Sequence, residues 1–407
     1  GTNWVNPEIF PGIIDANTYR PLIELAKKSN FNILRTWGGA IVNKESFFEI
    51  CDELGVLVWQ EFTQACLPYE GTDAYLEVLE QESRSIIRQV RKHACLAIWS
   101  GGNELFATWS RMTDQSLALR VLNRNCLEMD PLTPFIPTSP LMGMAHGDYR
   151  FRDHEGREVY QIFGDSRCTA YTEFGVPSPS SVETLKSFMS EEELFPPRRG
   201  TAWESHHAFG AWHGDTKSWL MPWVIEYYFG KSDTLELLVE RGQWLQAEGY
   251  KAIYEEARRQ KPRCSMALNW CYNEPWPCAA NNSLIAWPLD VKPALAAVGE
   301  SCRPQLLSAR LPKFLWHSSD SFELEAWVLN DRHEPMPEDT VTVVLVLGAD
   351  EVELGKWTHS GVEENANLKG PTLKTRLPES DSDVLEVQLR SERDASLDST
   401  YRLRFLP

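Results

Sequence analysis

The first three quarters of the chain alternate between helical and strand patterns. Apolar residues recur at helical spacing in the segments 18–30, 44–54, 73–91, 114–129 and 234–259. Short apolar runs at 32–37, 56–59, 95–99, 134–138, 168–174 and 265–270 are typical of strands buried on both faces. Gly55 is expected to end the second helix. Strands and helices that alternate with short links predict a parallel sheet.

The pattern changes after about residue 303. Before it, nearly 300 residues of strand and helix predict a (β/α)8 TIM barrel over 1–302. A doubly wound sheet is the alternative, made less favourable because no glycine-rich phosphate loop follows the early strands. After it, alternating or valine-rich strands at 321–328, 340–347, 384–389 and 401–405 predict a small antiparallel immunoglobulin-like β-sandwich over 303–407.

The charge balance narrows the partners. The 407 residues carry 40 basic and 58 acidic side chains, a formal net charge of −18. Such a surface repels phosphate backbones and anionic lipid headgroups, so neither nucleic acid nor a membrane surface is an expected partner. The chain has no apolar run of membrane-spanning length and no signal-peptide pattern at its start, and its compartment and oligomeric state stay open. The nine cysteines lack the tight pairs of zinc sites, so we expect buried thiols.

Two carboxylates stand where the active site of a parallel barrel is expected. Glu104 follows the strand at 95–99 within the run 99–104 (WSGGNE), and Glu173 lies in the apolar run 171–175 (YTEFG). Two such groups across one pocket can serve as general acid and as nucleophile, which is what cleavage of a glycosidic bond requires. The sixteen tryptophans suit stacking on sugar faces, although indoles also fill large cores. Alternatively, each glutamate is a capping or salt-bridging group.

Several segments taken together resemble glycoside hydrolase family 2, and they are most similar to its β-mannosidase branch. They are 32–39 (NILRTWGG), 51–62 (CDELGVLVWQEF), 98–104 (IWSGGNE) and 172–175 (TEFG). The resemblance implies a retaining exo-β-glycosidase with Glu104 as acid/base and Glu173 as nucleophile. It further implies that Asn103 binds the sugar 2-hydroxyl, that Arg35 lies beside Glu173, and that no metal or organic cofactor is needed. The implied partner is an oligosaccharide or glycoside substrate.

Further residues are weaker candidates for substrate binding. Trp37, Trp270 and Trp276 are expected to wall the terminal sugar, with core packing as the alternative. Glu61 stands where the branch usually has Asp and is a candidate for holding a distal hydroxyl. His146, in a small-residue loop before the nucleophile strand, is a candidate with a structural role as its alternative. His206, His207 and His213 are interpreted as loop residues and not as metal ligands.

The sugar specificity stays open at this point. The run 270–277 (WCYNEPWP) departs from the usual β-mannosidase pattern. The same machinery acting on β-galactosides or β-glucosaminides, or a non-catalytic carbohydrate-binding fragment, is therefore carried as an alternative. Because the family places β domains before its barrel, we also expect this chain to be part of a longer protein.

Overall fold

The N-terminal part of the molecule is built on a parallel sheet. The computed structural model describes residues 1–210 and 218–407. Five strands lie in the order β1-β2-β3-β4-β5, and each pairs in parallel with the next. Their bounds are β1 (Thr2–Trp4), β2 (Ile33–Thr36), β3 (Leu57–Glu61), β4 (Leu96–Ser100) and β5 (Phe135–Ile136). The predicted parallel sheet is confirmed here, and the carboxyl ends of these strands meet at one edge.

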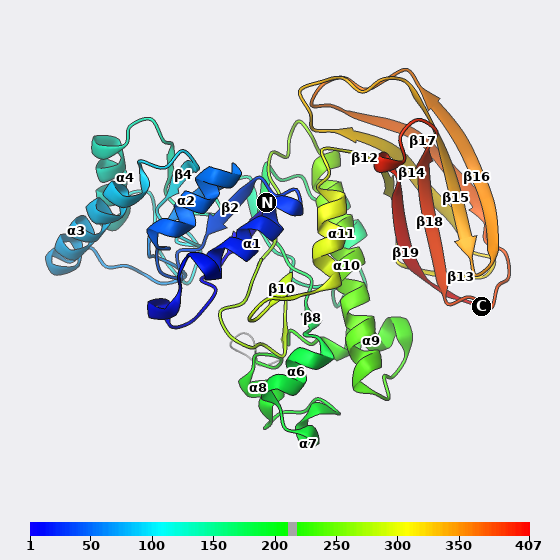
Figure 1. Cartoon of the computed structure of the whole chain (residues 1–407), viewed down its shortest axis with the longest axis horizontal. Helices are drawn as coiled ribbons and strands as arrows, with labels where there is room; N and C mark the ends of the chain where they lie inside the picture. Colours follow the sequence, from blue (N-terminus) through cyan, green and yellow to red (C-terminus); the bar gives the residue numbers. More distant parts are fainter. Residues whose placement is uncertain (211–217) are drawn as a thin grey trace.

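Helices connect these strands in the predicted alternation. They are η1 (Pro11–Ile13), α1 (Ala16–Lys28), α2 (Glu45–Leu54), α3 (Asp73–Val90) and α4 (Leu117–Met129). The Asp15 carboxylate caps α1 by accepting from the backbone N–H groups of Asn17 and Thr18. Gly55 ends α2 in the left-handed conformation with a φ of 64°, as the sequence predicts. Figure 1 shows these elements in blue and cyan at one side of the molecule.

The middle of the chain continues with shorter sheets. A parallel pair joins β6 (Met144–His146) to β7 (Ala170–Glu173), and antiparallel pairs join β8 (Ser178–Pro179) to β9 (Ala280–Asn281) and β10 (Ile285–Ala286) to β11 (Asp290–Val291). Isolated parallel bridges link β1 and β7 to the segment 265–270, at Asn269 and Ala267. Within the described part of the chain, the sheets do not form one closed ladder.

The segment 265–270, predicted as a strand, forms isolated parallel bridges to β1 and β7 and not a regular strand. The Asn3 side chain donates to the carbonyls of Leu268 and Asn269, and the Asn269 N–H donates to the Tyr254 hydroxyl. The backbone of this segment also pairs on both sides, because the Leu268 N–H donates to the Tyr171 carbonyl and the Asn3 N–H donates to the Asn269 carbonyl.

Helices of the middle part surround these short sheets. They are α5 (Val159–Asp165), α6 (Val182–Phe188), α7 (Glu191–Leu194), α8 (Ala202–Ser205), α9 (Pro222–Phe229), α10 (Leu235–Arg259) and α11 (Pro293–Ser301). The long α10 runs through the middle of the molecule, between the N-terminal part and the orange and red C-terminal sheets (Figure 1). His213, which the sequence analysis interprets as a loop residue, lies outside the described residues.

Two β-sheets form the C-terminal part. One has the order β12-β14-β17 and the other β13-β19-β18-β15-β16. The strands are β12 (Gln305–Arg310), β13 (Leu315–His317), β14 (Ser321–Asn330), β15 (Asp339–Leu347), β16 (Asp350–His359), β17 (Asn367–Arg376), β18 (Val384–Ser391) and β19 (Ser399–Leu406), with η2 (Ala395–Leu397) before the last. Phe322 and Leu324 on β14 are buried as their alternation predicts. One detail differs from an all-antiparallel arrangement, because β13 pairs with β19 in parallel.

The C-terminal sheets contact α10 through polar groups, some of them buried. The Glu255 carboxylate accepts hydrogen bonds from the hydroxyls of Ser308 and Tyr401, both at 2.6 Å. The Trp244 indole donates to the Arg402 carbonyl at 2.9 Å. No helix within the described ranges is long and apolar enough to cross a membrane.

Candidate active site

The catalytic candidates gather at the carboxyl edge of the parallel strands. Two glycines bring the loop after β4 to this edge. A Cβ at Gly101 would lie 2.3 Å from the Pro137 carbonyl oxygen, and one at Gly102 would lie 2.3 Å from that of Gln64. Gly102 also has a φ of 151°, which side chains rarely adopt. The diglycine therefore lets the chain pass close to its neighbours and present Asn103 and Glu104.

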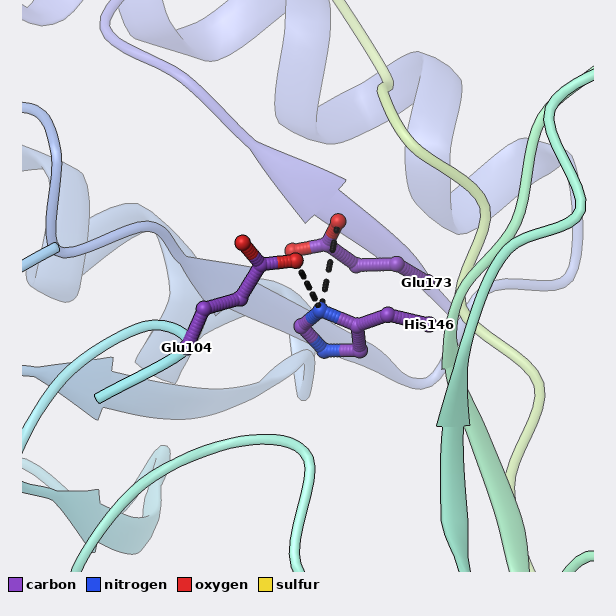
Figure 2. Close-up of side chains that lie close together, drawn as sticks. All are labelled: Glu104, His146 and Glu173. Atoms are coloured by element: carbon purple, nitrogen blue, oxygen red, sulfur yellow. Dashed lines mark hydrogen bonds and ion pairs between the residues drawn. The ribbon is translucent and has the colours of Figure 1, made fainter. Parts of the chain in front are cut away.

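Glu104 and Glu173 converge on the imidazole of His146 (Figure 2). The His146 Nδ1 lies 2.9 Å from Glu104 Oε1 and 3.6 Å from Glu173 Oε2. The Glu104 side chain is 20% exposed, whereas those of His146 and Glu173 are 6% exposed. The two carboxylates, 69 residues apart in sequence, thus share one small space that is open to solvent on the Glu104 side.

Arg35 lies beneath the two carboxylates and binds several polar side chains of this site. Its guanidinium is fully buried and donates to Glu173 Oε1 at 2.8 Å and to Asn103 Oδ1 at 2.6 Å. It also donates to Asn3 Oδ1 at 2.7 Å and, through two nitrogens, to Glu61 Oε1. A planar fork with five N–H donors suits this many acceptors. The expected position of Arg35 beside Glu173 is therefore observed.

The surroundings of Glu173 hold it in the ionised form. Burial alone would raise its pKa, but the charges of His146 and Arg35, with hydrogen bonds from Tyr149 and Arg35, outweigh burial and lower the pKa. The Tyr149 hydroxyl donates to Glu173 Oε2 at 2.6 Å. Burial and the neighbouring Glu173 charge raise the pKa of Tyr149 well above its usual value, so it remains a donor. Glu173 thus has the charge state that a nucleophile needs.

The structure gives Glu61 a different place from the expected one. Its side chain has no exposed surface, Oε1 accepts from Arg35, and Oε2 accepts from the Gly38 N–H at 2.8 Å. It therefore has no exposed oxygen for a sugar hydroxyl, and its described contacts hold Arg35.

The three candidate tryptophans are half-buried and form two groups. Trp37 and Trp270 pack edge to face with ring centroids 4.9 Å apart. Trp276 instead stacks on His206, at 4.9 Å, and His206 stacks on Phe188 at 4.2 Å. His206 and His207 lie just after α8, in agreement with their interpretation as loop residues.

The segment after Trp270 turns away from the carboxylate pair. Asn273 Nδ2 donates to the Val5 carbonyl, and Glu274 accepts from the Ser283 hydroxyl and the Trp287 N–H. Both Asn273 and Glu274 are buried. Glu274 is therefore a core group, as is Tyr272, whereas Trp270 and Trp276 of the same run are half-buried.

Sequence reasoning missed four groups of this site. Tyr149 contacts Glu173, Asn3 contacts Arg35, and Ser139 Oγ lies 3.0 Å from His146 Nε2. Cys66 Sγ lies 3.5 Å from Glu104 Oε2. His146 lies at the end of β6 and pairs with Glu173 on β7, and not in a loop as the sequence analysis predicts. Tyr149 follows it by three residues, which is the only sequence signal that pointed to Tyr149.

Two further features bear on ligands. Glu104, His146 and Glu173 each offer a ligand atom, and these atoms lie within 4.8 Å of one another, so this trio could hold a metal ion. Separately, a cavity of about 1020 Å³ lies beside the amino ends of β2 and β3, with Ile33, Leu57 and Trp327 in its lining. That cavity does not include the carboxylate pair.

Comparisons with known proteins show what the chain is similar to. No protein family model matches the chain. The chain is 25% identical to β-mannosidase B of Thermothelomyces thermophilus over 436 residues, which cover 96% of the chain and 50% of the relative. It is 26% identical to the β-mannosidase of Capra hircus over 326 residues, 70% of the chain and 36% of the relative. The chain thus spans about half or less of these relatives' length.

Solved structures share the fold. The β-D-mannosidase from Dictyoglomus thermophilum matches 99% of this chain and 50% of its own, with a TM-score of 0.81 and 23% identity. The exo-chitosanase from Amycolatopsis orientalis matches 99% of this chain and 48% of its own, with a TM-score of 0.75 and 17% identity. The sequence relatives and these folds are those of glycoside hydrolases. The chain is thus similar in sequence to β-mannosidases and in fold to a β-D-mannosidase and an exo-chitosanase.

Proposed function

We propose that this chain carries the catalytic site of an exo-acting β-glycosidase of the β-mannosidase type. Glu104 and Glu173 supply the two carboxyl groups, with ligand atoms of the pair within 4.8 Å of each other. Retaining glycosidases place their carboxyl groups ~5–5.5 Å apart, whereas inverting enzymes need ~6.5–9.5 Å to admit a water. This close approach is the observation that carries the proposal, and it favours retention.

The proposed reaction has two steps. Glu173 attacks the anomeric carbon while Glu104 protonates the leaving oxygen, which gives a glycosyl ester on Glu173. Glu104 then deprotonates water, which attacks the same carbon and releases the sugar and the Glu173 carboxylate. Arg35 and Tyr149 support this route because they hold Glu173 ionised before attack. Neither step calls for a metal or an organic cofactor.

The substrate would lie against the groups around this pair. Asn103 is proposed to meet the sugar 2-hydroxyl, and Trp37 with Trp270 to wall the ring. In the described part of the structure, the buried Trp37 Nε1 has no hydrogen-bond partner, and such a donor can serve a sugar hydroxyl. His146 is proposed to hold the carboxylates in place. Trp276, stacked on His206, would lie further from the carboxylate pair than Trp37 and Trp270.

We also propose the architecture that the sequence predicts. The parallel strands and the bridges at Ala267 and Asn269 support a (β/α)8 barrel over 1–302. The two C-terminal sheets support an immunoglobulin-like sandwich over 303–407.

The test is turnover of aryl β-mannoside, β-galactoside and β-glucosaminide, compared with Glu173→Gln and Glu104→Ala. We expect mannoside hydrolysis, loss of turnover in both variants, and an ester on Glu173 detectable by mass spectrometry with a 2-deoxy-2-fluoro glycoside. Hydrolysis of the galactoside but not the mannoside would end the mannose assignment. An intact protein without turnover on any of the three would favour carbohydrate binding, and unchanged turnover in Glu104→Ala would remove its acid role.

A further inference from the structure

The Cys66 side chain contacts Asn103 and Glu104, which lie in the loop after β4. It lies in the loop after β3, is half-buried, and places Sγ 3.5 Å from Glu104 Oε2. The Asn103 amide donates from Nδ2 to the same sulfur at 3.3 Å. The backbone fixes this approach, because the Cys66 N–H donates to the Asn103 carbonyl at 3.0 Å. The thiol therefore contacts both Glu104, the proposed acid/base, and Asn103, the proposed ligand of the sugar 2-hydroxyl.

The backbone at both ends of the contact is unusual. Cys66 has a φ of 55° and Glu104 a φ of 53°, a left-handed conformation that is uncommon outside glycine. Such residues persist where the surroundings fix them, and they concentrate at functional positions. The Glu104 N–H donates to the Ser139 carbonyl at 2.7 Å, which holds that end in place. Two strained residues thus turn their side chains toward each other.

The thiol remains protonated at neutral pH. Burial, followed by the nearby Glu104 charge, raises the pKa of Cys66 to about 12. An S–H group that faces a carboxylate acts as a donor to it, and hydrogen bonding to the charged form favours that form.

Building on the proposed function, we propose that Cys66 is a positioning residue for the acid/base. Its S–H donates to Glu104 Oε2 while its sulfur accepts from Asn103, so one side chain sets the distance between the two. His146 holds the other oxygen, Oε1. The further charged or titratable groups in this space are Glu173, Arg35 and Tyr149. Cys66 therefore acts through the position of Glu104 relative to Asn103 and through proton transfer by Glu104, without contact to the reacting atoms.

The first test compares Cys66→Ala, Cys66→Ser and the control Cys168→Ala on β-glycosides with good and poor leaving groups. Cys168 is also half-buried, and its sulfur contacts the Ser166 hydroxyl instead. We expect Cys66→Ala to lower kcat/KM about three- to tenfold for an alkyl leaving group and far less for dinitrophenolate, which needs little acid help.

The pH dependence of kcat/KM is a second measurement, because a role of Cys66 in packing alone would leave it unchanged. Without the S–H donor the ionised Glu104 is less stable, so the alkaline limb of kcat/KM should move to higher pH in Cys66→Ala. Cys66→Ser, which keeps a donor, should restore most of both effects, and Cys168→Ala should change neither. Two results for Cys66→Ala would overturn the proposal. One is an equal loss of kcat/KM for all leaving groups with the alkaline limb unmoved, and the other is no loss of kcat/KM at all.

A second test does not depend on turnover. Alkylation of Cys66 by iodoacetamide, followed by mass spectrometry, should be faster in Glu104→Gln than in the original protein, because a thiolate would no longer face a carboxylate. An unchanged rate would show that the contact does not form. A protein without turnover on any β-glycoside would refute the proposed function, and this rate would still decide the contact.

Discussion

Arg35 and Glu173 form a buried ion pair, with Nη1 2.8 Å from Oε1, although they belong to strands β2 and β7. The same guanidinium reaches Asn103 Oδ1, so one side chain orients both the proposed nucleophile and the proposed 2-hydroxyl ligand. Glu61 in turn holds two nitrogens of Arg35. The positive charge of Arg35 and the directions of its guanidinium N–H groups therefore contribute separately to the site.

Arg35→Lys should separate them. A lysine keeps the positive charge but cannot direct N–H groups at Glu173, Asn103 and Glu61 at once. We expect kcat to fall on the order of a hundredfold, as for a catalytic group displaced by about an ångström, while the protein stays folded. Steady-state kinetics and circular dichroism measure the two. The control is Arg20→Lys, at an exposed ion pair with Glu53, which should leave kcat unchanged. A kcat in Arg35→Lys equal to that of the control would contradict the role of the fork.

Tyr149→Phe should change the acid side of the pH profile. The hydroxyl donates to Glu173 Oε2 and is one of the causes that lower the pKa of that carboxyl, so its loss raises the pKa. Because attack needs ionised Glu173, the acid limb of kcat/KM should move to higher pH. Loss of a hydrogen bond to a charged group corresponds to roughly ten- to hundredfold at the plateau.

The control for Tyr149 is Tyr227→Phe. Tyr227 is 52% exposed and lies on α9, so neither limb should move. An acid limb that stays in place in Tyr149→Phe would mean that this hydroxyl does not set the charge state of Glu173.

Strand order explains what the sequence could predict of this site. Residues at the carboxyl ends of parallel strands share one edge, so Arg35, Glu104 and Glu173 could be expected together from the alternation of strands and helices. Glu61 could be placed at the same edge but not given its partner. Whether its oxygens face the sugar or Arg35 depends on side-chain packing that no spacing encodes.

The parts that were missed depend on contacts between segments distant in sequence. Cys66 reaches Glu104 through a loop in the left-handed conformation, for which the sequence carries no glycine as a signal. Strands β16 and β17 are largely exposed or half-buried, so their apolar alternation is too weak to find. The parallel pairing of β13 with β19 joins strands about 90 residues apart, a register that local patterns do not determine.

Gly102→Ala should destabilise the protein and disturb the site. The added Cβ would lie 2.3 Å from the Gln64 carbonyl oxygen at a φ of 151°. Backbone strain and overpacking together are expected to cost about 2–4 kcal/mol in the free energy of unfolding. Denaturant unfolding measures this change. Gly164→Ala in α5 is the matched control, because nothing lies within 4 Å of its Cβ and alanine suits a helix. A Gly102 variant as stable as this control would show that the loop has room to adjust.

The final prediction concerns how α10 holds the C-terminal sheets as pH changes. Burial, only partly offset by Lys251 and by a hydrogen bond from the Arg402 N–H, raises the pKa of Glu248 to about 7. Glu255 adds a like charge on the same helix. A carboxyl whose folded-state pKa is raised contributes stability below about pH 4.5, and this contribution is lost as pH rises toward 7.

Glu248→Gln should therefore make the protein more stable than the original at pH 8, by a few kcal/mol, with a much smaller difference at pH 5. Urea unfolding at both pH values measures it, and Glu240→Gln, exposed on α10, should show no such pH dependence. Equal effects of Glu248→Gln at the two pH values would mean that Glu248 does not titrate in this interval, and that the contact of α10 with β19 tolerates its charge.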